Sequence, residues 1–353
     1  MDYTAELGAF CLAGEPVIVR PYGEGHINQT YYVETDAGKK YILQRINTRL
    51  FTDVSALMRN IELVTGHIAQ KNRLTGETGL TLVRTKDGAA YLQADSGAYR
   101  VYDFIDNATS HQIVAAPALF YESAVAFGDF QNKLTDFDAA QLTEVLPDFH
   151  NTVKRLSDFE ASRKRDAVGR AREVEKEIDF VLRRRDYADK LVGLLTGGAI
   201  PRRVTHNDTK LNNVMISDTT GKAVAVIDLD TVMPGSCLYD FGDSIRFGCN
   251  SGAEDEPDLK QVNFRIDLFE TYAEGYLKTL TTLTNTEKQN LALSAIVMTY
   301  ECGMRFLMDH LDGDVYFRIK RPGHNLDRAR TQFKLIEDME SRLNAMQKIV
   351  AAQ

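Results

Sequence analysis

The chain has 353 residues, of which 44% are hydrophobic, and its formal net charge at pH 7 is −8. A chain of this length can bury a sizeable core and is expected to divide into two lobes. The negative charge argues against broad electrostatic attraction to nucleic acid or to an anionic membrane, so neither is expected as a partner.

Four widely spaced cysteines form no C-x-x-C pair, which argues against a thiolate zinc site and against a disulfide framework. No apolar run approaches the roughly 20 residues of a membrane span, and the first residues lack the pattern of a signal peptide. We therefore expect a cytoplasmic protein, and the sequence indicates no obligate protein partner.

The first part of the chain predicts a small antiparallel sheet with one helix. Residues 16–35 and 39–47 contain β-branched and aromatic runs separated by Gly and Asp turns, as in hairpins. A helix is predicted over residues 54–70, where apolar residues recur at the spacing of one helix face, namely Leu57, Ile61, Val64 and Ile68.

The patterns after residue 115 are mostly helical. Candidate helices cover residues 115–134, 139–153, 170–194, 262–280, 286–311 and 327–350. We therefore predict an α+β fold, with a sheet-based N-terminal lobe of residues 1–105 and a larger helical C-terminal lobe of residues 106–353.

Two features of the first lobe suggest a nucleotide site. In YGEGHINQTYYV, Gly23 and Gly25 lie between two β-like segments, where missing side chains let backbone N–H groups approach phosphates. Glycine is also common in ordinary turns. The segment RVYDFID lies where a hinge between lobes presents backbone groups to adenine, which makes Tyr102 and Phe104 candidate nucleotide-binding residues. A plain core strand is the alternative.

The stretch THNDTKLNNVMI concentrates polar residues where a strand begins. His206, Asp208 and Asn213 have the spacing H-x-D-x-x-x-x-N of a phosphoryl-transfer loop, in which Asp receives the hydroxyl proton and Asn holds Mg²⁺. The apolar segments on both sides of DTTG predict a β-hairpin, which places Asp228 across from Asn213. We predict that Asp208 is the catalytic base and that Asn213 and Asp228 bind Mg²⁺.

Other interpretations of these residues exist. His206 is expected to organise the loop rather than to perform chemistry, and Asp240 and Asp243 are expected to stabilise it. Asp228 and Asp230 also match the D-x-D motif of metal-dependent glycosyltransferases, although that motif leaves Asp208 and Asn213 unexplained.

The strand YILQRIN departs from a kinase-like third strand, which normally supplies a phosphate-binding Lys. It offers Gln44 instead, a candidate nucleotide-binding residue without full charge, followed by Arg45 on the opposite face. Arg45 or Lys40 is expected to compensate. Glu62 on the predicted helix either holds such a cation or lies exposed to solvent.

At this point the chain resembles the aminoglycoside phosphotransferase and choline kinase superfamily, and most closely the bacterial N-acetylhexosamine 1-kinases. The resemblance runs over nearly the full length. It is carried by YGEGHINQTYYV, YILQRIN, FGDFQ, THNDTKLNN, IDLDTVMPGS, DFGDSIRFG, ECGMRFL and HNLDRARTQ. The replacement of the strand Lys by Gln44 is similar to the pattern of the sugar 1-kinase group.

The resemblance implies a two-lobed protein-kinase-like fold with an ATP-binding lobe and a catalytic lobe. It further implies ATP and Mg²⁺ as cofactors and phosphorylation of the anomeric hydroxyl of N-acetylglucosamine or N-acetylgalactosamine. Such a neutral sugar is held by hydrogen bonds, for which Arg305 and Tyr316 are the candidate substrate residues. A kinase for another small hydroxyl compound (aminoglycoside, choline or homoserine) and a nucleotide-binding pseudokinase are the alternatives.

Overall fold

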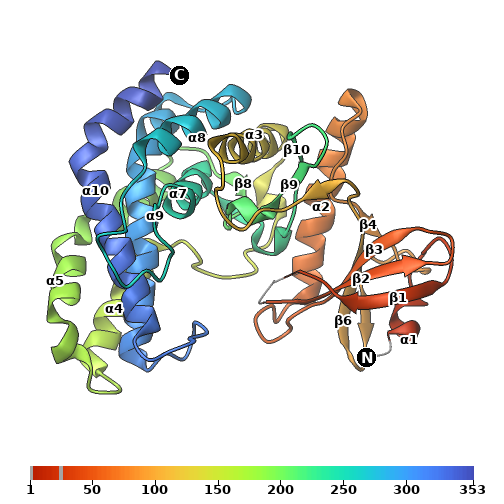
Figure 1. The fold of residues 1–353 in the computed structure, drawn as a ribbon, viewed down its shortest axis with the longest axis horizontal. Helices are drawn as coiled ribbons and strands as arrows, with labels where there is room; N and C mark the ends of the chain where they lie inside the picture. The colour runs from red at the N-terminus through yellow and green to blue at the C-terminus, as the bar shows by residue number, and fades with distance from the viewer. Residues whose placement is uncertain (1–2, 24–26) are drawn as a thin grey trace.

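The computed structural model describes residues 3–23 and 27–353, and the chain folds into two lobes (Figure 1). An antiparallel sheet and helix α2 form the N-terminal lobe, and helices form most of the C-terminal lobe. This architecture confirms the predicted α+β fold class. The predicted division at residue 105 stays a prediction; it falls just after strand β6, which ends at Asp103.

The N-terminal sheet has the strand order β1-β2-β3-β6-β4, with β5 beside β6, and every pairing is antiparallel. The strands are β1 (Pro16–Pro21), β2 (Gln29–Thr35), β3 (Lys40–Arg45), β4 (Leu82–Val83), β5 (Leu92–Ala94) and β6 (Gly97–Asp103), preceded by the short helix α1 (Thr4–Leu7). Gln44 of β3 lies directly opposite Arg100 of β6. Because directly opposed residues of antiparallel strands share one face, these two side chains are neighbours.

Helix α2 (Val54–Thr75) covers this sheet and confirms the predicted helix. The Asp53 side chain caps its N-terminus, and Gly76 ends it in a left-handed conformation, with φ of 75°. The apolar face points into the core, where three of its residues are fully buried: Leu57, Ile61 and Val64.

The C-terminal lobe is built around two long neighbouring helices, α9 and α10 (Figure 1). Its helices are α3 (Pro117–Lys133), α4 (Thr152–Arg165), α5 (Glu175–Arg183), α6 (Ala188–Thr196), α7 (Cys237–Gly248), α8 (Ile266–Thr279), α9 (Asn285–Asp312) and α10 (His324–Ala352). By length and composition α9 could cross a membrane, but 78% of its most apolar window is buried inside the fold, as in a core helix.

Short strands form two further small sheets, separate from the N-terminal one. They are β7 (Ala108–Thr109), β8 (Arg203–Thr205), β9 (Val214–Ser217), β10 (Ala223–Val226) and β11 (Met233–Gly235). β9 and β10 form the predicted hairpin, β7 extends it, and β8 pairs with β11. The loop with the phosphoryl-transfer spacing therefore joins β8 to the hairpin.

Two helix predictions need correction, and helices α4 and α7 were not predicted. Residues 139–153 begin with a single short turn and continue irregularly, because Pro147 interrupts the pattern and Asp148 is left-handed, with φ of 58°. The predicted helix 170–194 is split into α5 and α6 near Arg184, whose side chain reaches Glu340 on α10. Helix α7 was missed because eleven of its 12 residues are buried, polar ones included, so no exposed polar face reveals a helical period.

Close packing of α7 on α9 predicts sensitivity at Gly242. A Cβ atom there would lie 2.5 Å from Ser294 O and 2.5 Å from Met298 Cγ of α9. We expect Gly242→Ala to lower the free energy of unfolding by about 1–3 kcal/mol, measured by urea denaturation. Gly66→Ala, at an exposed position of α2 with open space around it, should instead stabilise by about 0.5–1 kcal/mol. Equal effects of the two substitutions would contradict this account.

Candidate active site

Asp208 lies in the loop between β8 and the turn that leads into β9. Its side chain is 29% exposed, and Oδ1 lies 3.0 Å from Nζ of Lys210. Oδ2 accepts a hydrogen bond of 3.1 Å from Nδ2 of Asn213. These two contacts orient the carboxylate, while its exposure leaves it within reach of a substrate hydroxyl group.

Two buried carboxylates of α7 hold the backbone of this loop. Asp240 accepts hydrogen bonds from the N–H groups of His206 and Asn207, at 3.0 and 2.8 Å. Asp243 accepts one of 3.1 Å from the N–H group of Thr209. The expected stabilising role of both carboxylates is thus confirmed.

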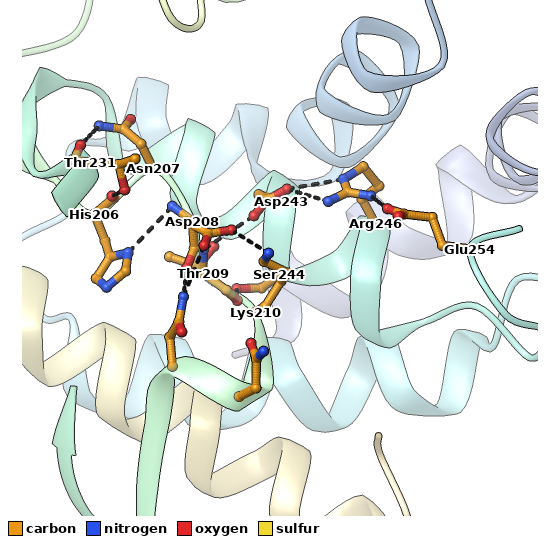
Figure 2. Close-up of polar contacts among 12 residues, drawn as sticks. His206, Asn207, Asp208, Thr209, Lys210, Thr231, Asp243, Ser244, Arg246 and Glu254 are labelled. Atoms are coloured by element: carbon orange, nitrogen blue, oxygen red, sulfur yellow. Dashed lines mark hydrogen bonds and ion pairs between the residues drawn. The ribbon is translucent and has the colours of Figure 1, made fainter. Parts of the chain in front are cut away.

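The charge of Asp243 has its own partner. Burial favours the neutral acid, but the guanidinium of Arg246 and the ammonium of Lys210 lower the pKa of Asp243 below its usual value. Arg246 lies 2.9 Å from Asp243 and 2.8 Å from Glu254, which forms the chain of contacts drawn in Figure 2. The catalytic loop therefore rests on a charged network inside the C-terminal lobe.

His206 is fully buried and joins the loop to the hairpin. Its Nδ1 accepts from the N–H group of Asp208 at 3.3 Å, so Nε2 carries the proton and donates to the Ile227 carbonyl at 2.9 Å. The ring also packs edge-on against Phe127 and Phe130. These contacts confirm the organising role that was expected of His206.

The hairpin brings Asn213 and Asp228 to the same end, as predicted. Val214 pairs with Val226, and the N–H group of Ile227 donates to the Asn213 carbonyl at 2.9 Å. Asp228 follows in a left-handed conformation, with φ of 59°. The described residues contain no cluster of three or more His, Cys, Asp or Glu side chains able to hold a metal. This amide and carboxylate supply hard oxygen ligands but only part of a coordination shell, which suits a cation shared with a ligand.

Asp228 is surrounded by negative charge. Burial, followed by the carboxylates of Asp230 and Asp208, raises its pKa to about 7. Near neutral pH a large share of folded chains therefore hold a proton on Asp228, which a bound cation would displace.

The nucleotide-side predictions are placed as follows. Gly23 lies in the turn between β1 and β2 with φ of 75°, a conformation that favours glycine, whereas Gly25 lies outside the described residues. Tyr102 belongs to β6, and Phe104 directly follows that strand. The Phe104 N–H group donates to the Lys40 carbonyl, so it is already used; that of Ile105 has no acceptor among the residues described.

The structure reveals a cation that the sequence analysis missed. Arg100 is 1% exposed, and its Nε donates to Oε1 of Gln44 at 2.9 Å. Its Nη1 lies 2.5 Å from Oδ1 of Asp230, two residues beyond Asp228. Asp230 also accepts from Nδ2 of Asn28 at 2.5 Å, so two residues of the N-terminal lobe meet one carboxylate of the C-terminal lobe.

The residues expected to compensate for Gln44 lie elsewhere. Lys40 is 2.6 Å from Asp106, and Arg45 donates to the Ser96 carbonyl at 2.5 Å. Glu62 is 42% exposed and pairs with Arg84, at 2.6 Å, rather than with a cation of β3. The expectation that Lys40 or Arg45 compensates stays a prediction, and in this structure each side chain is engaged by another partner.

Arg305 and Tyr316 line one pocket of about 220 Å³ in the C-terminal lobe. The Arg305 guanidinium lies 5.9 Å from the Tyr316 ring, 5.5 Å from the Phe317 ring and 5.6 Å from the Phe149 ring. Asp309 shapes the loop that carries Tyr316, because it accepts hydrogen bonds from three consecutive N–H groups, those of residues 315–317. The predicted substrate residues are thus brought together.

A buried pair that was not predicted links this pocket to the catalytic loop. Glu301, one turn before Arg305 on α9, lies 2.7 Å from Nδ1 of His150. Nε2 of His150 lies 3.4 Å from the carbonyl oxygen of Asn207, the residue before Asp208. Burial favours neutral Glu301, yet His150 lowers the pKa of Glu301 below its usual value. The sequence around His150 gives no local signal for this pair, because His150 and Glu301 are 151 positions apart.

The comparisons with known proteins agree with this arrangement. Residues 18–279 match the model of the phosphotransferase enzyme family, known as APH. The chain belongs to this family.

Solved structures of similar fold have low sequence identity. An aminoglycoside phosphotransferase from Alicyclobacillus acidocaldarius is 13% identical, with a TM-score of 0.59, and the match covers 100% of this chain and 97% of that one. The amicoumacin kinase hAmiN, in complex with AMP-PNP, Ca²⁺ and Ami, is 13% identical, with a TM-score of 0.60 and coverage of 96% and 92%. A microcompartment-associated aminopropanol kinase is 15% identical, with a TM-score of 0.58 and coverage of 98% and 97%. These matches show the kinase-like fold.

The raised pKa of Asp228 predicts a stability change with a definite sign. An unfolded aspartate has a pKa of about 3.9, so the folded chain loses stability as pH rises from there to about 7, where Asp228 must ionise. Asp228→Asn removes this loss. We expect the variant to melt at a higher temperature than the parent chain, by a larger margin at pH 8 than at pH 5, in thermal denaturation without metal.

Asp95→Asn is the matched control, since Asp95 is exposed in the turn between β5 and β6. It should shift the melting temperature little at either pH. A margin for Asp228→Asn that does not grow with pH would contradict the assignment.

Proposed function

We propose that this phosphotransferase uses ATP and Mg²⁺ to phosphorylate the anomeric hydroxyl of an N-acetylhexosamine, N-acetylglucosamine or N-acetylgalactosamine. The observation that carries the proposal is the joint placement of Asp208, Asn213 and Asp228. His150 joins the loop of Asp208 to Glu301, one turn from the unpaired Arg305 of the pocket. The amicoumacin kinase complex, with its nucleotide analogue and divalent cation, supports nucleotide and metal use by this fold.

Asp208 is the proton acceptor in this proposal. As the anomeric oxygen bonds to the γ-phosphorus of ATP, its proton passes to the Asp208 carboxylate and ADP leaves. Lys210, 3.0 Å from Asp208, offsets the local negative charge, and the amide of Asn213 keeps the carboxylate in one orientation. An anomeric hydroxyl is more acidic than other sugar hydroxyls, so a single carboxylate suffices.

Asn213 and Asp228 would hold Mg²⁺ through an amide and a carboxylate oxygen. The bound cation would neutralise charge on the phosphate oxygens of ATP. Most of the acceleration then comes from positioning, which the hydrogen bonds from α7 to the catalytic loop provide.

The acceptor pocket favours a neutral, hydroxyl-rich compound. The Arg305 guanidinium makes no hydrogen bond or ion pair with any described residue, whereas other enclosed arginines, such as Arg203 and Arg246, pair with carboxylates. Its N–H donors are therefore available to the oxygens of a sugar. Tyr316 is 61% exposed beside it and offers a ring face.

The acidic residues of the pocket are already paired, which argues against a cationic acceptor such as choline or an aminoglycoside. Asp309 is used by backbone N–H groups, and Asp312 accepts from Ser162 and Arg165. The pocket lining holds two arginines, Arg155 and Arg305, beside these two aspartates, so it offers a cationic group no unpaired carboxylate.

Phosphorus NMR tests the reaction directly. With Mg-ATP and a mixture of the two N-acetylhexosamines, we expect a sugar 1-phosphate signal together with ADP. Asp208→Asn should remove the product signal, since the base is lost, while Asp218→Asn, in the exposed hairpin turn, should retain it. ATP binding without any product from these sugars would sink the substrate assignment and favour another acceptor or a pseudokinase.

The Arg305 assignment makes a separate kinetic prediction. Arg305→Met should raise the KM for the sugar by roughly 10-fold or more, as expected for a lost charged hydrogen bond, and leave the KM for ATP nearly unchanged. Arg318→Met is the control, because Arg318 lies on the exposed surface of the following loop. A rise in both KM values, or none in either, would remove Arg305 from the acceptor site.

A further inference from the structure

The kinase-like sheet lacks its usual cation on the third strand. The side chain at that place is Gln44, and both nearby cations of β3 have partners of their own. Lys40 pairs with Asp106 at the start of the strand, and Arg45 faces the opposite side and binds the Ser96 carbonyl. A triphosphate bound under this sheet would therefore meet no free cation from β3.

Arg100 fills this position from the neighbouring strand. It lies directly across from Gln44, and the hydrogen bond from its Nε to Oε1 of Gln44 fixes the guanidinium beside the Gln44 side chain. Met58 of α2 and the ring of Tyr102 close the other sides. The positive charge that β3 lacks is thus supplied by the neighbouring strand β6, roughly 5 Å away on the same face of the sheet.

Two acidic residues of the C-terminal lobe lie close to the Arg100 guanidinium. Nη1 lies 2.5 Å from Asp230, and Asp228 also stabilises the charged form of Arg100. Burial alone would lower the pKa of Arg100, but these carboxylates raise it above its usual value, so the side chain stays cationic. Nη2 has no hydrogen-bond partner among the residues that the structure describes, which leaves one donor group for a ligand.

We propose that Arg100 binds the phosphate groups of the nucleotide in place of a β3 lysine, with Gln44 and Asp230 positioning its guanidinium. This inference rests on the use of ATP proposed above but not on the identity of the acceptor. Asp228 at the hairpin end and Arg100 on the sheet lie close enough to interact electrostatically, the first as the proposed metal ligand and the second as the cation. A phosphate chain carrying a divalent cation needs both.

Nucleotide binding with and without phosphates tests the proposal. Isothermal titration of the full chain with MgCl₂ and either ADP, ATP or adenosine separates the phosphate contribution from the base. Arg100→Met should weaken ADP and ATP binding by roughly 10- to 100-fold, the range for loss of a charged hydrogen bond, and leave adenosine affinity within about twofold. Arg45→Met, on the opposite face, should leave all three affinities unchanged.

A double variant that moves the positive charge to β3 tests whether the effect of Arg100→Met is only structural. The double variant Gln44→Lys with Arg100→Met returns a cation to β3, and it should recover most of the lost ADP affinity. Arg100→Met with Asp230→Asn removes the unpaired buried carboxylate, so it should fold, as judged by circular dichroism, and still discriminate poorly between ADP and adenosine.

The outcomes separate the two proposals. Unchanged ADP affinity in Arg100→Met, or an equal loss for adenosine, would overturn the role of Arg100 while leaving ATP use intact. If the parent chain itself binds ADP and ATP no better than adenosine, nucleotide use fails, and the proposal fails with it.

Discussion

The position of Asp208 depends on two carboxylates buried on α7. Isolated buried carboxylates are costly, and Asp240 and Asp243 are stabilised because they accept N–H hydrogen bonds from the loop that precedes the hairpin. The same hydrogen bonds satisfy N–H groups of the loop, which has no regular secondary structure to pair them. α7 itself is fixed by its close approach to α9 at Gly242, so core packing of the C-terminal lobe sets the geometry of the reacting carboxylate.

A few side chains of opposite charge lie close together around Asp228. Asp208, Asp228 and Asp230 face Arg100 and Lys210, and the excess of negative charge is relieved by a proton on Asp228. A divalent cation would replace that proton, and a phosphate chain would then restore the balance. The D-x-D pair at 228 and 230 therefore has divided roles in this fold. Asp230 pairs with Arg100 and Asn28, so the two carboxylates are not equivalent ligands of one metal, as the glycosyltransferase interpretation would require.

The sequence predicted features that depend on local spacing. The H-x-D-x-x-x-x-N loop, the hairpin behind it and helix α2 each follow from residues close together in the chain, and all three are present. The Arg100 contact was missed because strand register joins residues 56 positions apart, and no local pattern reveals register. The His150–Glu301 pair was missed for the same reason. The helix predicted at 139–153 is absent because the backbone restriction at Pro147 overrides the helical spacing of the apolar residues there.

Helix α9 carries Arg305, which the proposed function assigns to the acceptor, and two of its neighbours along the helix. Glu301, Arg305 and Asp309 follow one another at four-residue spacing on α9, so they lie along one stripe of its surface. None of them contacts the nucleotide-side residues of β3 or β6 in the interactions described above. Glu301 reaches the Asp208 loop through His150, and Asp309 holds the loop that carries Tyr316, so exchange of either would disturb the fold. The Arg305 guanidinium has no such partner among the described residues. Under the proposed function, substitution at this one position is therefore the change that would alter the accepted compound while the rest of the stripe stays in place.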